Sequence, residues 1–195
     1  MYFFIFSAKK REKIAIFATS MTQIILITGG QRSGKSQMAE KLALELSQNP
    51  VYVATAHIWD EEFRERVKRH QERRGPQWTN IEEERELSLH NLTGRVVVVD
   101  CITLWCTNFF FDCNKSDQEQ PSVDEALQAL KAEFDRFTNQ DATFIFVTNE
   151  IGLGGVSTDA IQRRFTDLQG WMNQYVAEKA DEVILMVSGI PVKIK

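Results

Sequence analysis

Short runs of apolar and β-branched residues alternate along this chain with longer segments in which apolar positions recur every three or four residues. The runs predict β-strands at residues 24–28, 51–55, 95–100, 143–148 and 183–187. The periodic segments predict helices at about residues 35–48, 60–73, 103–111, 122–137 and 158–179. Ser122 and Glu125 have the spacing of a capping box, which supports a helix start at that point.

The order of these elements indicates the fold class. Four consecutive valines, Val96 to Val99, indicate a strand buried on both faces, as strands of a parallel sheet are. Gly189 turns the last strand into a short ending at residues 192–194, which predicts an antiparallel edge hairpin. We therefore expect an α/β fold with a mostly parallel, doubly wound sheet and an antiparallel C-terminal edge, in one domain over residues 21–195. Ligands of such sheets bind outside the carboxyl ends of the strands.

The pattern G-x-x-x-x-G-K-S lies between the first expected strand and the first expected helix. Its glycines let the backbone turn tightly, so that N–H groups and the helix N-terminus face an anionic phosphate. Lys35, expected at the solvent-facing end of the loop, would reach the β- and γ-phosphates, and Ser36 would hold Mg²⁺. The alternative is a chance glycine-rich turn, which the strand–loop–helix context disfavours. The residues expected to bind nucleotide here are Gly29, Gly30, Gln31, Arg32, Ser33, Gly34, Lys35 and Ser36.

Asp100 ends the valine strand, and its carboxylate is expected beside the phosphate loop at the same edge of the sheet. This is the position of the second acid that anchors Mg²⁺ in phosphate-loop enzymes. The alternative is an aspartate that only caps the following helix, and both roles can coexist.

Charge and cysteine content exclude several classes of partner. The net charge is −4 with no basic tail or stripe, which argues against nucleic acid and membrane surfaces as partners. No apolar run approaches the ~20 residues of a membrane helix, so membrane insertion is not expected. The three cysteines, Cys101, Cys106 and Cys113, form no C-x-x-C pair, which argues against a disulfide framework or a zinc site and indicates reduced thiols in the cytoplasm.

Residues 1–20 precede the regular pattern of strands and helices. They combine an apolar stretch at residues 2–6, a basic stretch at 9–13 and a second apolar stretch at 14–17. A secretory signal places its charges first and needs a longer apolar core, so this order fits one poorly. Met21 immediately precedes the first expected strand, and we expect residues 1–20 to be a weakly ordered upstream extension.

The helix expected at residues 60–73 carries an unusual polar face. Glu62, Arg66 and His70 are spaced at i, i+4 and i+8, so they line up along one side of the helix. A neutral imidazole can attack phosphorus, and guanidinium groups can neutralise the charge that builds on the transferred group. A solvated surface histidine is the alternative, and these residues alone favour it. The arginines expected to gather around the imidazole are Arg69, Arg73 and Arg74.

Further motifs accompany the phosphate loop: Val-Ala-Thr-Ala at 53–56, Arg-Val-Lys-Arg-His at 66–70, Trp78, Asp-Cys-Ile-Thr-Leu-Trp at 100–105, Val-Thr-Asn-Glu at 147–150 and Val-Ser-Gly-Ile-Pro-Val-Lys at 187–193. Together they resemble the bifunctional adenosylcobinamide kinase/adenosylcobinamide-phosphate guanylyltransferase family of cobalamin assembly. The resemblance covers nearly all of residues 24–195. The histidine segment and the Thr-Asn-Glu strand end are not general features of phosphate-loop proteins, which makes the resemblance specific.

The resemblance implies a RecA-like phosphate-loop NTPase fold and a homotrimer that catalyses two reactions. The first phosphorylates adenosylcobinamide with ATP or GTP. The second takes GMP from GTP through a guanylylated histidine and passes it to adenosylcobinamide phosphate, giving adenosylcobinamide-GDP and pyrophosphate. The implied partners are therefore a corrinoid substrate, the two nucleotides and Mg²⁺.

The resemblance also assigns residues. His70 matches the guanylylated histidine of the family, and Asn149 and Glu150 leave their strand where the family would use them near substrate, although a plain turn explains them equally well. The stretch 73–76 shows extra spacing relative to the family, and residues 1–20 have no counterpart in it. The positions that contact nucleotide outside the loop fall on Thr55, Ala56, His57, Gln71, Glu72, Arg73, Arg74, Glu82 and Asp100.

Three alternatives remain open at this point. One is a phosphate-loop kinase of another small metabolite, with His70 as a surface residue. Another is an enzyme that retains only the guanylyltransferase activity. The last is a nucleotide-binding switch or assembly protein that performs no chemistry on a metabolite. Incubation with α-labelled GTP separates these alternatives. Only a guanylyltransferase would retain the label on the protein, whereas a kinase or a switch would not.

Overall fold

The computed structural model describes residues 22–58, 61–72, 74–111 and 122–195. The expected extension at residues 1–20, the predicted nucleotide-binding residue Arg73, and Cys113 lie outside these ranges. The helix at residues 61–72 is described as backbone throughout, but six of its side chains are not: Glu62, Phe63, Arg66, Val67, Arg69 and His70.

The described residues form one seven-stranded sheet in the order β3-β2-β4-β5-β1-β6-β7. Every neighbouring pair is parallel except β6 and β7, which are antiparallel. The strands are β1 (Gln23–Gly29), β2 (Val51–Ala54), β3 (Thr79–Glu82), β4 (Val96–Asp100), β5 (Thr143–Val147), β6 (Glu182–Val187) and β7 (Ile190–Lys193). The predicted parallel sheet with an antiparallel C-terminal edge is thus confirmed.

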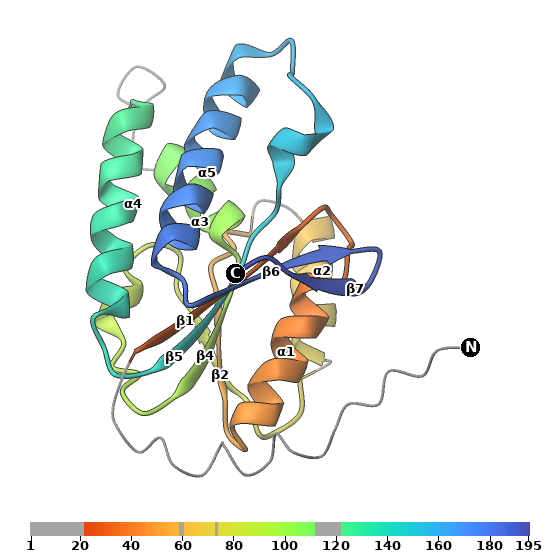
Figure 1. The fold of residues 1–195 in the computed structure, drawn as a ribbon, viewed down its shortest axis with the longest axis vertical. Coiled ribbons are helices and arrows are strands. Elements are labelled where there is room, and N and C mark those ends of the chain that lie inside the picture. The colour runs from red at the N-terminus through yellow and green to blue at the C-terminus, as the bar shows by residue number, and fades with distance from the viewer. Residues whose placement is uncertain (1–21, 59–60, 73, 112–121) are drawn as a thin grey trace.

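Helices cover both faces of the sheet, with α1 and α2 on one side and α3, α4 and α5 on the other (Figure 1). The connections within the described ranges include the short 3₁₀ turns η2 (Leu87–Leu89) and η3 (Ile151–Gly154). Across the described ranges, no helix has both the length and the apolar character needed to cross a bilayer. The helices are α1 (Lys35–Leu46), α2 (Glu61–Glu72), α3 (Ile102–Phe110), α4 (Val123–Thr138) and α5 (Ala160–Lys179).

Alternate residues of the central strands supply two separate cores. Leu26, Val97 and Val99 pack with the apolar faces of α3, α4 and α5. Ile27 and Val98 belong to the second core, on the opposite face against α1. Because successive strand side chains point to opposite faces, a run of valines is the sequence that fills both cores at once. This explains why the expected buried strand at residues 95–100 lies in the middle of the sheet.

The other expected elements are found within a few residues of their predicted bounds. The capping box of α4 is confirmed, because the Ser122 hydroxyl accepts from the Glu125 N–H at 3.2 Å and the Glu125 carboxylate accepts from the Ser122 N–H at 2.8 Å. The predicted edge hairpin is confirmed as β6 and β7, in which Met186 lies opposite Pro191.

Strand β3 was not predicted. Its four residues are mostly polar and exposed, so they show neither an apolar run nor a buried alternation. It is a strand because its backbone pairs in parallel with β2, with Tyr52 opposite Asn80. An edge strand of this kind is defined by its neighbour and not by its own composition.

Candidate functional site

The phosphate loop follows β1 at the carboxyl edge of the sheet and leads into α1. Gly34 precedes α1 in the left-handed region, with φ of +97°, and makes no side-chain cap to the helix. The first N–H groups of α1 therefore open toward the loop without a side-chain acceptor from the capping residue. An anionic phosphate is the ligand that such a helix start favours.

Lys35 is buried, which corrects the expectation that it lies on a solvent-facing loop end. Its side chain is 7% exposed, and its ammonium group donates to the Gly30 carbonyl at 2.6 Å. The loop wraps over the start of α1, so that its own carbonyl supplies the acceptor that a buried ammonium needs. The charge is thereby held at the loop.

Ser33 contributes a second feature of a ligand site. Its hydroxyl oxygen is buried and has no hydrogen-bond partner among the described residues. Buried polar atoms in folded proteins are nearly always paired, so an unpaired hydroxyl inside a phosphate loop fits a ligand oxygen. Ser36 follows in the first turn of α1 and is half-buried.

The β6–β7 turn supports the loop from the other side. The Gly189 N–H donates to the Ser33 carbonyl at 3.0 Å, and Gly34 lies against the Gly189 backbone. The motif at residues 187–193 therefore has a structural role next to the site: its turn holds the backbone of the phosphate loop in place.

Gly29→Ala is expected to destabilise the protein by about 3 kcal/mol, because φ at this position is +145° and an added Cβ would lie 2.5 Å from the Met186 carbonyl oxygen. In thermal unfolding this corresponds to a Tm lower by roughly 6–12 °C. Gly30→Ala is the matched control, since an added Cβ there meets nothing within 4 Å. Equal Tm values for the two variants would contradict the close packing of β1 on β6.

Asp100 lies at the expected edge of the sheet but not directly beside the phosphate loop. Strand β5 separates β4 from β1, so the strand that Asp100 ends is two positions from the strand that carries the loop. The Tyr52 hydroxyl donates to the Asp100 carboxylate at 2.5 Å. Burial raises the pKa of Tyr52 well above its usual value, and the negative charge of Asp100 raises it further. Tyr52 therefore stays a neutral donor that orients Asp100.

Arg74 extends this arrangement toward β3. Its guanidinium carbon lies 3.7 Å from the centroid of the Tyr52 ring, and its Nε donates to Asn80 at 2.7 Å. Its Nη1 is buried and has no hydrogen-bond partner among the described residues. A buried guanidinium N–H without a partner, next to a predicted nucleotide site, fits a phosphate oxygen. We call Tyr52, Arg74, Asn80 and Asp100 the Tyr52 cluster.

The last turn of α2, which carries His70, is tied to the end of β3. Gln71 donates to the Glu82 carboxylate at 2.6 Å, so two of the predicted nucleotide residues lie together. Glu72 is exposed and pairs with Lys68 at 4.0 Å.

Because β3 and β1 are four strand spacings apart, the end of β3 lies about 19 Å from the phosphate loop.

Thr55 has a structural role at the end of β2. Its side chain is fully buried. The Thr55 hydroxyl donates to the Cys101 carbonyl at 2.8 Å and accepts from the Cys101 N–H at 2.9 Å. The Thr55 carbonyl accepts from the Asn108 side-chain amide. The next two predicted residues, Ala56 and His57, are half-buried, and His57 Nδ1 lies 2.9 Å from both carboxylate oxygens of Glu84.

Glu150 is the residue near the phosphate loop that the predicted nucleotide set omitted. Its carboxylate accepts from the Thr28 hydroxyl at 2.5 Å, and its N–H donates to the Gly29 carbonyl at 3.2 Å. Both partners lie at the end of β1, where the loop begins. The Thr-Asn-Glu motif marked this residue, but its place became evident only with the pairing of β5 and β1.

The predicted site thus falls into two groups at one edge of the sheet: the phosphate loop with Glu150, and the Tyr52 cluster with the end of α2. No group of three or more metal-binding side chains occurs within the described part of the chain.

Comparison with known proteins identifies the family that this chain resembles. The family model described as "Cobinamide kinase / cobinamide phosphate guanyltransferase", CobU, matches residues 25–194. The chain is 37% identical over 176 residues to the bifunctional adenosylcobalamin biosynthesis protein CobP of Pseudomonas aeruginosa, covering 87% of this chain and 96% of the relative. It is 38% identical over 181 residues to CobU of Escherichia coli K12, covering 88% of this chain and 99% of the relative.

Among solved structures, an ATPase from the type III secretion system of pathogenic bacteria superposes with a TM-score of 0.52 at 12% identity. The match covers 85% of this chain and 51% of the ATPase. This likeness concerns the fold alone, and it confirms the predicted RecA-like arrangement.

Proposed function

The chain belongs to the CobU family of cobinamide kinases and cobinamide phosphate guanyltransferases of cobalamin biosynthesis, and we propose that its two reactions use the two groups of residues at this sheet edge. The observation that carries the proposal is the phosphate loop at the open start of α1, with a buried Lys35 and a Ser33 hydroxyl that no described residue pairs with. The helix that carries His70 ends beside the same edge, at β3.

In the kinase reaction, the phosphate loop would hold the nucleoside triphosphate, with ATP or GTP as the donor. Lys35 would contact the β- and γ-phosphates, and the α1 N–H groups would face the phosphate oxygens. The corrinoid hydroxyl would attack the γ-phosphorus as the bond to the β-phosphate oxygen breaks. This reaction needs positioning and charge neutralisation, which the loop provides, and no covalent intermediate.

In the guanylyltransferase reaction, His70 would attack the α-phosphorus of GTP and release pyrophosphate. The phosphate of the corrinoid would then displace the histidine and take the GMP. Covalent catalysis divides one nucleotidyl displacement into two in-line steps. Support comes from Arg74, which follows His70 by four residues. Its Nη1 is buried, has no hydrogen-bond partner in the described part of the chain, and fits a phosphate oxygen.

We propose the remaining predicted residues as nucleotide contacts at these same places. His57, Gln71, Glu72 and Glu82 lie along the edge formed by the ends of β2, β3 and α2, together with Ala56 and the backbone of Thr55. They are partly or fully exposed, apart from Thr55, so ligand atoms can reach them.

Ser36 and Asp100 are the proposed protein ligands of Mg²⁺, directly or through water. Mg²⁺ at nucleotide sites uses one or two protein oxygens and completes its octahedron with phosphate oxygens and water. Bound with the nucleotide, the ion would neutralise charge on the transferred group.

Tyr52→Phe is expected to raise the Mg²⁺ concentration required for half-maximal kinase activity about tenfold, because Asp100 loses the donor that orients it. The maximal rate at saturating Mg²⁺ should remain close to that of the wild type. A magnesium titration of the phosphorylation rate measures both quantities. Tyr175→Phe is the matched control, since it removes a hydroxyl bonded to Asp135 on the α4–α5 side. An unchanged magnesium requirement in Tyr52→Phe would remove Asp100 from the metal site.

We also propose a homotrimer in the cytoplasm. The edge strand β7 and its surroundings expose apolar side chains, among them Val187, Ile190 and Ile194, and an exposed apolar edge favours contact with another protein surface. The two described cysteines, Cys101 and Cys106, are free and buried, as expected of a chain in a reducing compartment.

The proposal is tested with two labelled forms of GTP and with adenosylcobinamide. Label at the γ-phosphate should pass to the corrinoid, and label at the α-phosphate should first be retained on the protein and then appear in adenosylcobinamide-GDP. A protein that transfers only γ-phosphate would be a kinase alone. One that passes GMP to adenosylcobinamide phosphate but does not phosphorylate adenosylcobinamide would have retained only the second activity. Slow hydrolysis without transfer would indicate a nucleotide switch.

A further inference from the structure

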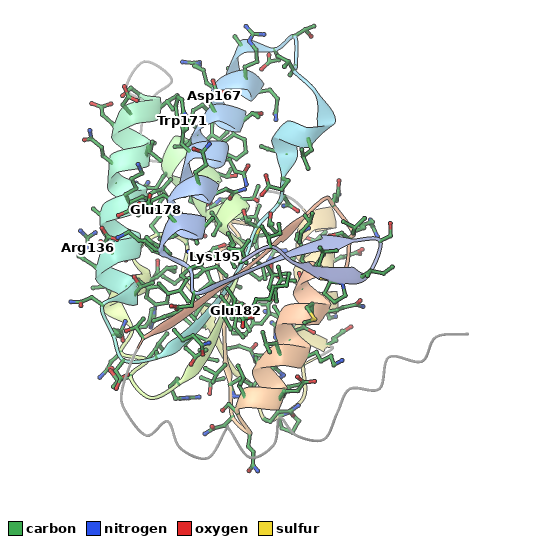
Figure 2. All side chains as sticks on the ribbon, viewed as in Figure 1. Arg136, Asp167, Trp171, Glu178, Glu182 and Lys195 are labelled. Atoms are coloured by element: carbon green, nitrogen blue, oxygen red, sulfur yellow. The ribbon has the colours of Figure 1, made fainter. Side chains whose placement is uncertain are left out.

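Helix α5 buries two amide side chains where it packs on the end of β5. Gln169 is 1% exposed and Asn173 is 6% exposed, one turn apart on the helix. The outer face carries Asp167, Trp171 and Glu178 (Figure 2). Burying an amide costs free energy unless its hydrogen bonds are made, so a helix that packed only for stability would carry apolar residues here.

The buried amides form a continuous network with the residues that follow β5. The Thr148 hydroxyl donates to Asn173 Oδ1 at 2.7 Å and accepts from Gln169 Nε2 at 3.1 Å. Gln169 and Asn173 both donate to the Asn149 carbonyl, at 2.5 and 3.1 Å. Asn173 Nδ2 also donates to the Glu150 carboxylate at 3.2 Å. The network thus leads from the interior of α5 to the acid at the phosphate loop.

Glu150 is held at a single carboxylate oxygen. Its Oε1 accepts from both Thr28 and Asn173, whereas Oε2 has no hydrogen-bond partner among the described residues. The chain continues into η3 and the glycines Gly154 and Gly155, which give the segment little stiffness of its own. The Glu150 backbone is held by the Gly29 carbonyl, so what the contacting side chains determine is the direction of the carboxylate.

We propose that Asn173 and Gln169 are positioning residues for phosphoryl transfer, which hold the Glu150 carboxylate at the phosphate loop with one oxygen directed to the substrate. In this step the oxygen of the attacking hydroxyl bonds to the γ-phosphorus, the bond from that phosphorus to the β-phosphate oxygen breaks, and the hydroxyl proton passes to Glu150. The inference rests on the proposed use of the phosphate loop in the kinase reaction.

Glu150→Gln tests the carboxylate. The amide oxygen of glutamine can still accept from Thr28 and Asn173, but the side chain cannot take a proton. We expect kcat for phosphorylation of adenosylcobinamide to fall about 100-fold or more, with KM for the nucleotide within about threefold of the wild type. GMP labelling of the protein should persist, since an imidazole attacks in that reaction. Unchanged kcat, or loss of GMP labelling together with nucleotide binding, would overturn the proposal for Glu150.

Asn173→Asp tests the positioning role. It keeps the acceptor for Thr148 but replaces the donor to Glu150 with an anionic oxygen, so the carboxylate should move away from its position. We expect a kcat lower by about 10- to 100-fold with little change in KM. Val176→Ala is the control. Val176 lies on the same buried face of α5 and belongs to the hydrophobic core, so its truncation should lower Tm by about 5 °C while retaining kcat.

The double variant Glu150→Gln with Asn173→Asp separates positioning from stability. Glutamine at 150 can donate to aspartate at 173, so the hydrogen bond is restored with its direction reversed, and Tm should recover toward that of the wild type. The kcat should stay as low as in Glu150→Gln alone, because Asn173 acts through a carboxylate that is no longer present. Additive losses of kcat, or equal kcat losses in Asn173→Asp and Val176→Ala, would show a purely structural role. A wild-type protein that does not phosphorylate adenosylcobinamide would instead contradict the proposed kinase function.

Discussion

His70→Ala is expected to reduce GMP labelling of the protein and formation of adenosylcobinamide-GDP by about 10³-fold or more, since it removes the attacking nitrogen. Phosphorylation of adenosylcobinamide should remain substantial, because in that step the substrate hydroxyl attacks the γ-phosphorus. The two activities are measured on the same preparation, one with α-labelled and one with γ-labelled GTP.

Two variants of α2 serve as comparisons for His70→Ala. Lys68 is exposed and pairs only weakly with Glu72, at 4.0 Å, so Lys68→Ala should leave both activities unchanged. Arg66→Ala should weaken labelling less than His70→Ala does, because it removes a neighbouring charge and not the nucleophile. Parallel loss of both activities in His70→Ala would indicate a structural role for this histidine.

Lys35→Ala is expected to impair both reactions, with phosphorylation reduced by about 10²- to 10³-fold in kcat/KM. The buried ammonium lies over the loop and is bonded to the Gly30 carbonyl, so it can neutralise phosphate charge with little reorganisation. Its removal also leaves that carbonyl without this donor, and we expect a stability loss of about 1 kcal/mol, which does not unfold the protein.

Lys41→Ala is the matched control for Lys35→Ala. Both lysines lie on α1, but the Lys41 side chain is exposed and pairs with Glu45 at 3.9 Å, an interaction of little energy at a surface. Steady-state rates for both reactions, together with Tm, should separate the two variants. If Lys35→Ala catalysed both reactions at wild-type rates, the phosphate loop would have no part in either reaction.

Much of the fold could be predicted from the sequence because the signals are local. The valine strand, the capping box of α4 and the glycine-rich loop each specify their own backbone, and each was found as expected. Strand β3 could not be predicted, since Thr79 and its polar neighbours become a strand only through pairing with β2. Propensity is weak for an edge strand that buries little apolar surface.

The arrangement of the site was harder to predict than the fold, because it depends on tertiary structure. The loop motif identified Lys35, but its burial follows from how the loop folds over α1. Asp100 was expected beside the loop, and the sheet places β5 between them, since the order of strands is not written in any single strand. For the same reason, the family resemblance placed Glu150 near substrate, but its contact with Thr28 at the start of the loop followed only from the pairing of β5 with β1. Asn173 gave no signal at all, because a single amide in an amphipathic helix is ordinary until its partners are known.

The most direct test is to identify the residue that carries GMP after incubation with GTP. The protein should be quenched at alkaline pH, where a phosphoramidate survives, and digested with a glutamate-specific protease. This places His57, His70 and His90 in different peptides, with His70 in the peptide 66–72. We expect mass spectrometry to find one GMP on that peptide, and we expect the adduct to be lost in acid. A GMP adduct on any other peptide, or none on a protein that forms adenosylcobinamide-GDP, would contradict it.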